Sequence, residues 1–396
     1  MEKGEGMTIL QLPSWYLPHG GQFVLHQTKA LQEAGLTVRI LANVVLPWTK
    51  YKGEMLNLKR FPCRPFFCEE DGVELLRHYS RPIPKSPILN IRYWAKQTLR
   101  LFGVYVRRYG LPDIVHVHSG TWGAYAASMI KKKYHVPYVV TEHRGVFGCK
   151  CQLARDFFRS EYTPFLREGY SNADYIIPVG DHLIPKISEF LIQDVPFRVV
   201  SNIVDTDFFV PEGSITKPHK PFRWISINGY YEVKGYDILL PAFDILCDKY
   251  SDVSLTIVGE NFQSASFLEL FARCRHKDRI HFTGELSREG VRSELQQADA
   301  FVMSSRVEAE PVSILEALAV GLPVAGTEVI PEYELPKQLG IRVPVEQPKL
   351  LAEAMCTLME NYGRYSAKAA HEHTVSIAHK NTVAQELISI YKQITK

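Results

Sequence analysis

Short apolar runs rich in β-branched residues alternate with longer amphipathic segments along the chain. Such runs predict buried strands, whereas an apolar repeat near 3.6 residues predicts helices. In the first half we expect strands at Thr8–Leu12, Val38–Ala42, Asp113–Val117, Tyr138–Thr141, Asp174–Val179 and Arg198–Val200. Helical patterns at Gln22–Ala34 and Ala124–Lys133 lie between them. This alternation is typical of a parallel sheet covered by helices.

A second series of strands begins after a polar, proline-containing linker at Pro211–Pro218. Its expected strands are Arg223–Ile227, Ser254–Val258, Ile280–Thr283, Ala300–Met303 and Val324–Gly326. A length of 396 residues suits two such α/β domains. We place the first at residues 1–205 and the second at 206–375. The amphipathic tail, 376–396, is expected to pack back on the first domain.

Charge is distributed unevenly between the two halves. Residues 1–200 hold 26 Lys+Arg and 17 Asp+Glu, a net +9, and the remaining 20 and 26 give −6. A basic first half suggests an anionic partner. The segment 91–108 interleaves basic and aromatic residues, which fits an ordinary surface helix or an interfacial helix on an anionic membrane. No nucleic-acid-binding motif is present, so we expect no nucleic acid partner.

Cysteine usage indicates a reducing compartment. The seven cysteines form no framework, and Cys149 and Cys151 lack a second pair with ligand spacing, so they are interpreted as ordinary thiols. No stretch approaches the roughly 18 apolar residues needed to cross a bilayer. We therefore expect a cytoplasmic protein, with peripheral binding to the inner face of a membrane as an open alternative.

The segment 304–318 carries the most chemical information. It follows the predicted strand Ala300–Met303 and opens a helix near Pro311. The N–H groups of Val312 and Ser313 would face an anionic phosphate there. Glu308 can accept hydrogen bonds from sugar hydroxyls. Glu316 is the only charge in an otherwise apolar stretch, and a ribose diol would be a suitable partner for it.

Glu308 and Glu316, with the apolar segment 317–324 after them, resemble the E-x7-E signature of retaining family 4 glycosyltransferases. That family has the GT-B fold, two Rossmann-like domains facing across a cleft. The resemblance implies that Glu308 contacts the donor sugar and Glu316 the ribose. It extends along most of the chain, through motifs at 13–16, 20–21, 113–119, 140–143, 202–208, 258–260 and 282–284.

Lys234, which precedes Gly235, stands at the position where the family has a cation that stabilises the leaving diphosphate. The alternative is a solvated lysine before a turn glycine. The resemblance also places Gly229, Gly259 and Gly284 near the nucleotide. An arginine usually stands where this chain has Gly229, so either one cation is absent or Arg306 or another basic residue replaces it. The chain also has Glu328-Val329 where the family has two glycines.

Five residues of the first half are candidates for the acceptor side. His118, which would also take part in catalysis, and the pair Glu142-His143 stand at the ends of predicted strands, where ligands bind in parallel sheets. Structural roles are the alternative for each. Gly20-Gly21 would let a substrate approach the backbone, or would form a plain tight turn.

Two other patterns are interpreted as misleading. Asp205-Thr206-Asp207 matches a metal-binding D-x-D, but its place at a domain junction favours a loop or capping role, and we expect no required metal or cofactor. Paired glutamates also occur in glycoside hydrolases, where they flank the scissile bond. Glu308 and Glu316 share one loop and helix, which suits a grip on one donor.

The sequence therefore predicts a metal-independent, retaining glycosyltransferase. Its donor would be a nucleotide sugar and its acceptor a glycan or lipid-linked hydroxyl of bacterial surface polysaccharide or glycolipid assembly. The alternative is a catalytically weak GT-B partner or scaffold. A Rossmann oxidoreductase is disfavoured because no G-x-G-x-x-G follows Thr8–Leu12.

Overall fold

The computed structural model describes residues 6–18, 20–47, 57, 59–145, 160–212 and 218–395. The chain divides into two compact units. Unit 1 comprises Met1–Ile203 and Lys380–Lys396, and unit 2 comprises Val204–His379. The C-terminal segment thus belongs to the same compact unit as the first half of the chain.

Unit 1 is built on a sheet whose described strands run in the order β3-β4-β2-β1-β5-β6-β7. All neighbours pair in parallel except β3 and β4, which are antiparallel. The elements are β1 (Thr8–Pro13), α1 (Gln22–Glu33), β2 (Thr37–Val45), β3 (Phe66–Glu70), β4 (Val73–Ser80), α3 (Pro87–Tyr109), β5 (Ile114–His118), α4 (Tyr125–Tyr134), β6 (Tyr138–Glu142), α6 (Thr163–Ser171), β7 (Tyr175–Pro178), α7 (Ile184–Ser188) and α14 (Lys380–Ile394).

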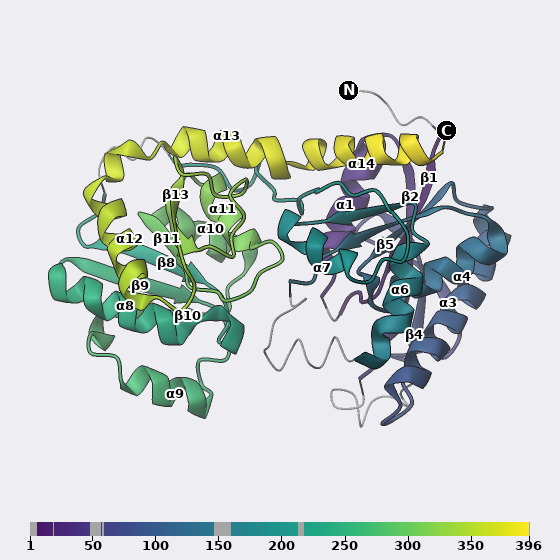
Figure 1. The fold of residues 1–396 in the computed structure, drawn as a ribbon, viewed down its shortest axis with the longest axis horizontal. Helices are drawn as coiled ribbons and strands as arrows, with labels where there is room; N and C mark the ends of the chain where they lie inside the picture. Colours follow the sequence, from purple (N-terminus) through teal and green to yellow (C-terminus); the bar gives the residue numbers. More distant parts are fainter. Residues whose placement is uncertain are drawn as a thin grey trace. The chain divides into compact units, whose positions relative to one another are not determined.

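Helices α1 and α14 pack on one face of this sheet, where Leu31 and Leu387 join the cores of β1, β5 and β6. Helix α4 contacts both α3 and α6. These three helices do not belong to the cluster around Leu31 and Leu387 (Figure 1). Leu387 is fully buried. The C-terminal helix therefore completes the core of unit 1 across a large sequence separation.

The observed strands differ from the predicted ones at the edges of the sheet. The hairpin of β3 and β4 was missed, because its charged residues, such as Glu69 and Glu74, interrupt the apolar pattern. Arg198–Val200 forms no strand: the chain there makes only an isolated bridge between Phe197 and Ile176. The sequence analysis also missed a strand of the second unit, β13 (Gly340–Val343).

Unit 2 has a fully parallel sheet in the order β10-β9-β8-β11-β12-β13. Its elements are β8 (Phe222–Ile227), α8 (Tyr236–Lys249), β9 (Val253–Val258), α9 (Ala265–Ala272), β10 (Ile280–Gly284), α10 (Arg288–Gln297), β11 (Ala300–Met303), α11 (Val312–Ala319), β12 (Val324–Thr327), β13 (Gly340–Val343), α12 (Pro348–Glu360) and α13 (Ala367–Ala378).

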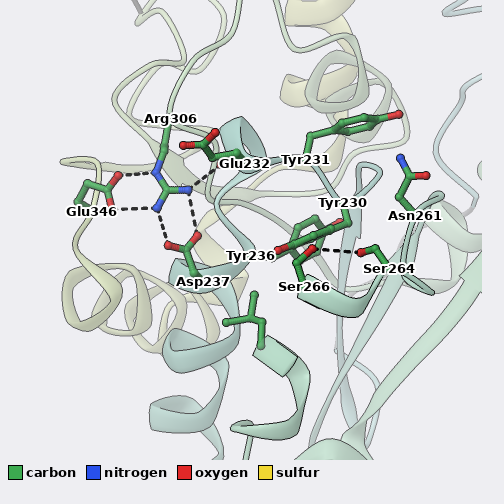
Figure 2. A pocket seen from close by; sticks show the side chains of 11 residues that line it. Tyr230, Tyr231, Glu232, Tyr236, Asp237, Asn261, Ser264, Ser266, Arg306 and Glu346 are labelled. Atoms are coloured by element: carbon green, nitrogen blue, oxygen red, sulfur yellow. Dashed lines mark hydrogen bonds and ion pairs between the residues drawn. The ribbon is translucent and has the colours of Figure 1, made fainter. Parts of the chain in front are cut away.

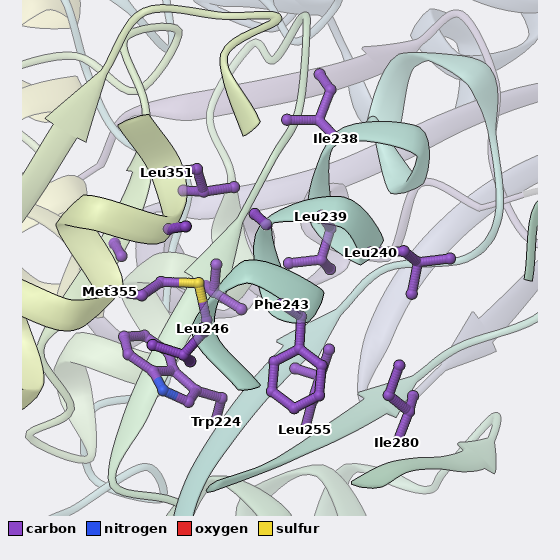
Figure 3. Packing of buried hydrophobic residues seen from close by; sticks show 14 of the residues in the cluster. Trp224, Ile238, Leu239, Leu240, Phe243, Leu246, Leu255, Ile280, Leu351 and Met355 are labelled. Atoms are coloured by element: carbon purple, nitrogen blue, oxygen red, sulfur yellow. The ribbon is translucent and has the colours of Figure 1, made fainter. Parts of the chain in front are cut away.

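The sheet of unit 2 is covered on both faces. On one face α8 and α12 pack against Trp224 and Leu255, and Figure 3 shows Phe243, Leu246 and Met355 filling the space between these helices and the strands. On the other face α10, α11 and α13 bury a second apolar cluster. Residues of both strands β8 and β11 alternate between the two clusters, as a doubly covered sheet requires.

Each sheet reverses its strand order once in its centre. In unit 1 the reversal lies between β1 and β5, and in unit 2 between β8 and β11. The loops that leave these strands at their carboxyl ends turn to opposite faces and open a crevice where ligands bind in such sheets. Both reversals lie beside residues singled out by sequence: His118 ends β5, and Lys234 and Glu308 follow β8 and β11.

Substitution of Leu387 by Ala should test whether α14 is part of the unit 1 core. We expect the free energy of unfolding to fall by about 2–5 kcal/mol, because the buried side chain leaves a cavity. Urea denaturation followed by circular dichroism measures the loss. Gln393→Ala, an exposed site on the same helix, is the control. Equal stability of the two variants would mean that α14 is not packed as described.

Candidate active site

Lys234 and Glu308 form an ion pair in unit 2. The Lys234 Nζ lies 2.7 Å from the Glu308 Oε1. The side chains are 23% and 10% exposed, so the pair is shielded but open to a small ligand. Lys234 ends a short 3₁₀ turn after β8, and Gly235 follows it in the left-handed region, with φ of 66°. The structure thus brings together the two residues to which the sequence assigns the donor sugar and the leaving group.

Helix α11 begins beside this pair, directly after Pro311. The predicted phosphate contact of the Val312 N–H stays a prediction, and without a ligand this group takes part in a turn. That group donates to the Glu310 carbonyl at 3.0 Å. The turn forms because the Pro311 ring fixes its φ, here −79° with ψ of 85°, which brings the Val312 N–H to the Glu310 carbonyl. Among the described residues the Ser313 N–H has no backbone acceptor, and its contact with an anion stays a prediction.

Glu316 lies one turn further along α11, on the same face as Val312. Burial raises the pKa of its carboxyl from 4.5 to about 7, and the Arg288 guanidinium opposes that rise. No hydrogen-bonding or ion-pair partner for this side chain is found in the described ranges, which is unusual for a carboxylate among apolar neighbours. A ligand hydroxyl would supply a partner for this carboxyl, and the ribose contact of Glu316 stays a prediction.

Gly229 leaves no room for the arginine that the family places there. A Cβ at Gly229 would lie 2.9 Å from the Tyr231 ring and 3.0 Å from the Glu260 side chain. Tyr231 donates a hydrogen bond to Glu260, and this contact occupies the space. Arg306 does not replace the arginine, because its guanidinium is bound by Asp237 and Glu346. The cation is therefore absent at this position.

The two other glycines of the predicted nucleotide site have different roles. Gly259 has φ of 149°, and a Cβ there would lie 2.5 Å from the Asn228 carbonyl oxygen. Its N–H donates to the Gly284 carbonyl, so the two glycine loops are joined. Gly284 itself has φ of 76° and open space around it. Gly259 is thus needed for close packing of backbone, and Gly284 for the turn.

In unit 1, three histidines stack at the carboxyl ends of β5 and β6. The His118 ring lies 4.7 Å from the His116 ring and 5.3 Å from the His143 ring. The His118 Nδ1 lies 3.0 Å from the His143 Nε2, and its Nε2 lies 2.6 Å from the Gln11 Oε1. With the Gln11 oxygen accepting, His118 carries its proton on Nε2 and accepts a hydrogen bond from His143.

All three histidines are neutral at physiological pH. Burial lowers the pKa of His116 and of His143 to about 3, and it also lowers the pKa of His118, with a further decrease from the neighbouring rings. Neutral imidazoles can donate and accept hydrogen bonds but cannot pair with an anion. His143 therefore suits a hydroxyl group better than a phosphate, whereas both ring nitrogens of the buried His118 are already used by Gln11 and His143.

Glu142 is fully buried and supports this region from within. Its carboxylate accepts hydrogen bonds from the Ser119 hydroxyl at 3.0 Å, the Gly120 N–H at 2.7 Å, the Arg144 N–H at 2.9 Å and the Tyr170 hydroxyl. A carboxylate with this many donors has little capacity left for a ligand. We therefore interpret Glu142 as a residue that supports the turn after β5, instead of the acceptor contact that the sequence predicted.

Gly20 and Gly21 both have positive φ, of 85° and 86°, and Gly21 precedes α1. A Cβ on Gly21 would lie 2.9 Å from the Trp15 carbonyl oxygen, so the chain folds tightly on itself here. Phe23, in the first turn of α1, contacts the His143 ring, with centroids 4.0 Å apart. The glycine turn is thus required by packing and lies beside the histidine stack.

The Asp205-Thr206-Asp207 segment is a structural turn. Asp205 accepts a hydrogen bond from the Phe208 N–H and pairs with Arg288, while Asp207 lies 3.6 Å from the His379 ring. No group of His, Cys, Asp and Glu side chains suited to a metal ion is found in the part of the chain that the structure describes. Cys149 and Cys151 lie outside the described residues. No helix in the described ranges is long and apolar enough to span a bilayer.

Several residues at these sites were missed from sequence. His116 could have been noticed, because residues two apart on a strand share a face and His118 follows it. Tyr391, whose hydroxyl lies 2.6 Å from the His116 Nδ1, gives no such signal, since 275 positions separate the two residues. Asp237 and Glu346, which bind Arg306, are likewise distant from one another in sequence.

Two sequence profiles match the chain, one to each half. The profile described as "Glycosyltransferase Family 4" matches residues 20–208. The profile described as "Glycosyl transferases group 1" matches residues 212–373. The two profiles meet at residues 208–212, a few residues after the division between units 1 and 2 at Ile203 and Val204.

The chain is 23% identical over 381 residues to the putative colanic acid biosynthesis glycosyltransferase WcaL of Escherichia coli, covering 85% of this chain and 87% of that protein. Among solved structures it is similar to sucrose-phosphate synthase of Thermosynechococcus elongatus, with a TM-score of 0.76, 18% identity and coverage of 98% and 99%. Anabaena HepE in complex with UDP has a TM-score of 0.71, 14% identity and coverage of 98% and 100%. These structural likenesses establish the GT-B fold.

The raised pKa of Glu316 predicts a pH-dependent stability. The unfolded chain releases this proton near pH 4.5 and the folded chain near pH 7, so stability falls as pH rises through that window. In Glu316→Gln, the loss of unfolding free energy between about pH 5 and pH 8 should be smaller than in wild type by about 2–3 kcal/mol. Urea denaturation at the two pH values measures it.

Glu353→Gln, an exposed site on α12, is the control and should keep the wild-type difference. If Glu316→Gln shows the same change of unfolding free energy between the two pH values as wild type, Glu316 is ionised and solvated in the folded protein, contrary to its environment in the structure.

Proposed function

This chain belongs to glycosyltransferase family 4, and from that premise we propose that it transfers a sugar, with retention of configuration, from a nucleoside diphosphate donor to an acceptor hydroxyl. The observation that carries the proposal is the Lys234–Glu308 ion pair at the reversal of strand order in unit 2. It places an ammonium and a carboxylate where a ligand enters the crevice. UDP sugars are the first donors to test, because the similar HepE was solved with UDP.

The ammonium of Lys234 would stabilise the leaving diphosphate. Negative charge on that group grows as the glycosidic bond breaks, so a fixed cation lowers the barrier more than it strengthens ground-state binding. The Ser313 N–H at the start of α11 would add a second donor.

Glu308 would hold a hydroxyl of the donor sugar, and Glu316 the ribose. Binding of the donor would replace the Lys234–Glu308 contact with contacts from each side chain to the ligand. No protein nucleophile is needed: the acceptor hydroxyl attacks from the face that the diphosphate leaves, and the departing phosphate oxygen takes its proton. The reaction then needs no metal or other cofactor. The neutral imidazole of His143 would orient a hydroxyl, and His118, whose ring nitrogens bind Gln11 and His143, would hold the His143 ring in place.

A lipid-linked or glycan acceptor at the inner face of a membrane fits the surface of α3. This helix contains no Asp or Glu, and it buries one face, including Trp94 and Phe102. Its outer face exposes Lys96, Arg100 and Arg107 with Tyr93, which is 44% exposed. Basic residues with an exposed aromatic ring favour an anionic lipid surface. The relation to WcaL supports an acceptor in surface polysaccharide assembly.

Glu308→Gln and Lys234→Ala should each reduce transfer by at least about 100-fold, because each removes a contact that strengthens in the transition state. Release of UDP or GDP from a panel of nucleotide sugars measures the rate, and circular dichroism checks the fold. Glu353→Gln and Lys349→Ala, exposed on α12, are the controls and should be fully active. Wild-type activity in Glu308→Gln would remove its role, and complete inertness of the wild type would favour a scaffold protein.

The triple variant Lys96→Gln, Arg100→Gln, Arg107→Gln should bind vesicles of phosphatidylglycerol about 100-fold more weakly than wild type, since each cation near an anionic surface contributes about 1 kcal/mol. Vesicle sedimentation measures binding. The triple variant Lys349→Gln, Arg364→Gln, Lys368→Gln, exposed in unit 2, is the control. Equal binding of the two variants, or equal wild-type binding to phosphatidylcholine vesicles, would exclude α3 as the contact surface.

A further inference from the structure

The loops that carry Lys234 and Glu308 leave two strands that pair only briefly. The ladder between β8 and β11 consists of Trp224 opposite Ala300 and Ile225 opposite Phe301. Beyond these residues the two strands are no longer paired by a ladder. The distance between the Lys234 ammonium and the Glu308 carboxylate therefore depends on contacts between the loops themselves.

Three successive carbonyls of the Lys234 loop accept hydrogen bonds from the Glu308 loop. The Glu232 carbonyl accepts one from the Arg306 guanidinium at 2.7 Å, and the Val233 carbonyl accepts one from the Arg306 backbone N–H at 2.7 Å. The Lys234 carbonyl accepts one from the Ser304 hydroxyl at 2.9 Å. The loops also touch closely, since a Cβ on Gly235 would lie 2.2 Å from the Ser304 carbonyl oxygen.

The Arg306 side chain is itself held from two further elements. It donates to both oxygens of Asp237, in the first turn of α8, at 2.9 and 2.6 Å. It also donates to both oxygens of Glu346, in the loop before α12. With the bond to the Glu232 carbonyl, all five N–H groups of the guanidinium are used. Figure 2 shows this cluster at one side of a pocket of about 820 Å³, with Tyr230, Tyr231 and Tyr236 away from it.

We propose that Arg306 is a positioning residue that sets the separation of Lys234 and Glu308 for glycosyl transfer. Its five N–H groups are used by Glu232, Asp237 and Glu346. It joins the two loops to α8 and to the loop before α12, so that neither loop can shift alone. This inference deepens the proposed function, and its prediction for the rate of transfer rests on that function. A planar guanidinium between two carboxylates fixes geometry in a way that the point charge of a lysine does not.

The kinetic test is Arg306→Lys, which keeps the charge but loses both two-pronged contacts. With the nucleotide sugar that wild type turns over, kcat should fall about 100-fold while the donor KM changes little, because a small displacement of reacting groups costs rate before it costs binding. Arg275→Lys is the matched control. Arg275 makes the same two-pronged contact with Asp248, at 2.9 and 2.7 Å, on unit 2 but with neither loop.

Equal kcat values for Arg306→Lys and Arg275→Lys, at equal melting temperature, would overturn the proposal. The proposal would also be overturned if Arg306→Lys lowered only the fraction of folded protein and left kcat per folded molecule unchanged, because that result indicates a purely structural role.

The second test needs no substrate. Brief treatment of the whole protein with acetic anhydride, followed by mass spectrometry of the peptide that contains Lys234, measures the reactivity of its amine. Pairing with Glu308 protects this amine in wild type, so Arg306→Lys should increase its acetylation rate severalfold and Arg275→Lys should not. An unchanged rate in Arg306→Lys would overturn the inference. If wild type turns over no nucleotide sugar but this difference is found, the proposed function fails and the positioning by Arg306 stands.

Discussion

The ion pair between Lys234 and Glu308 depends on one constraint: β8 and β11 are parallel neighbours at the point where the strand order of unit 2 reverses. Parallel pairing brings the carboxyl ends of both strands to the same edge, and the reversal sends their loops to opposite faces. Residues 74 positions apart thereby come within 2.7 Å. The helix start at α11 and the Arg306 cluster are both arranged around these two loops.

The two units present different kinds of polar group at equivalent places. At the reversal in unit 2 the groups are charged: an ammonium, a carboxylate and a helix start. At the reversal in unit 1 the stacked side chains are histidines, whose pKa burial lowers, and the nearby Glu142 carboxylate is turned to the Ser119–Gly120 backbone and Tyr170. Charged groups suit a nucleoside diphosphate, and neutral hydrogen-bonding groups suit an acceptor hydroxyl. This difference follows from the residue types at the two places and from the burial of the histidine rings.

Two charged side chains of these sites, Glu142 and Arg306, are held by saturated hydrogen bonding, whereas Glu316 is not. Glu142 has donors from the turn after β5 and from Tyr170, and Arg306 uses every N–H it has. Glu316 differs, since burial raises its pKa to about 7 and no partner compensates within the described residues. An uncompensated carboxyl costs stability, which is typical of groups retained for a ligand.

The sequence by itself determined the two series of strands, with His118 at the end of one strand and Lys234 and Glu308 in the loops after two others. Those features are local, because strand and helix periods and strand-end positions can be counted along the chain. Only the tertiary structure decided that Arg306 is bound by Asp237 and Glu346, that Glu142 supports a turn, and that Tyr391 contacts His116. These outcomes depend on which distant side chains reach the same buried space, and burial and hydrogen-bond saturation are properties of packing that no spacing along the chain encodes.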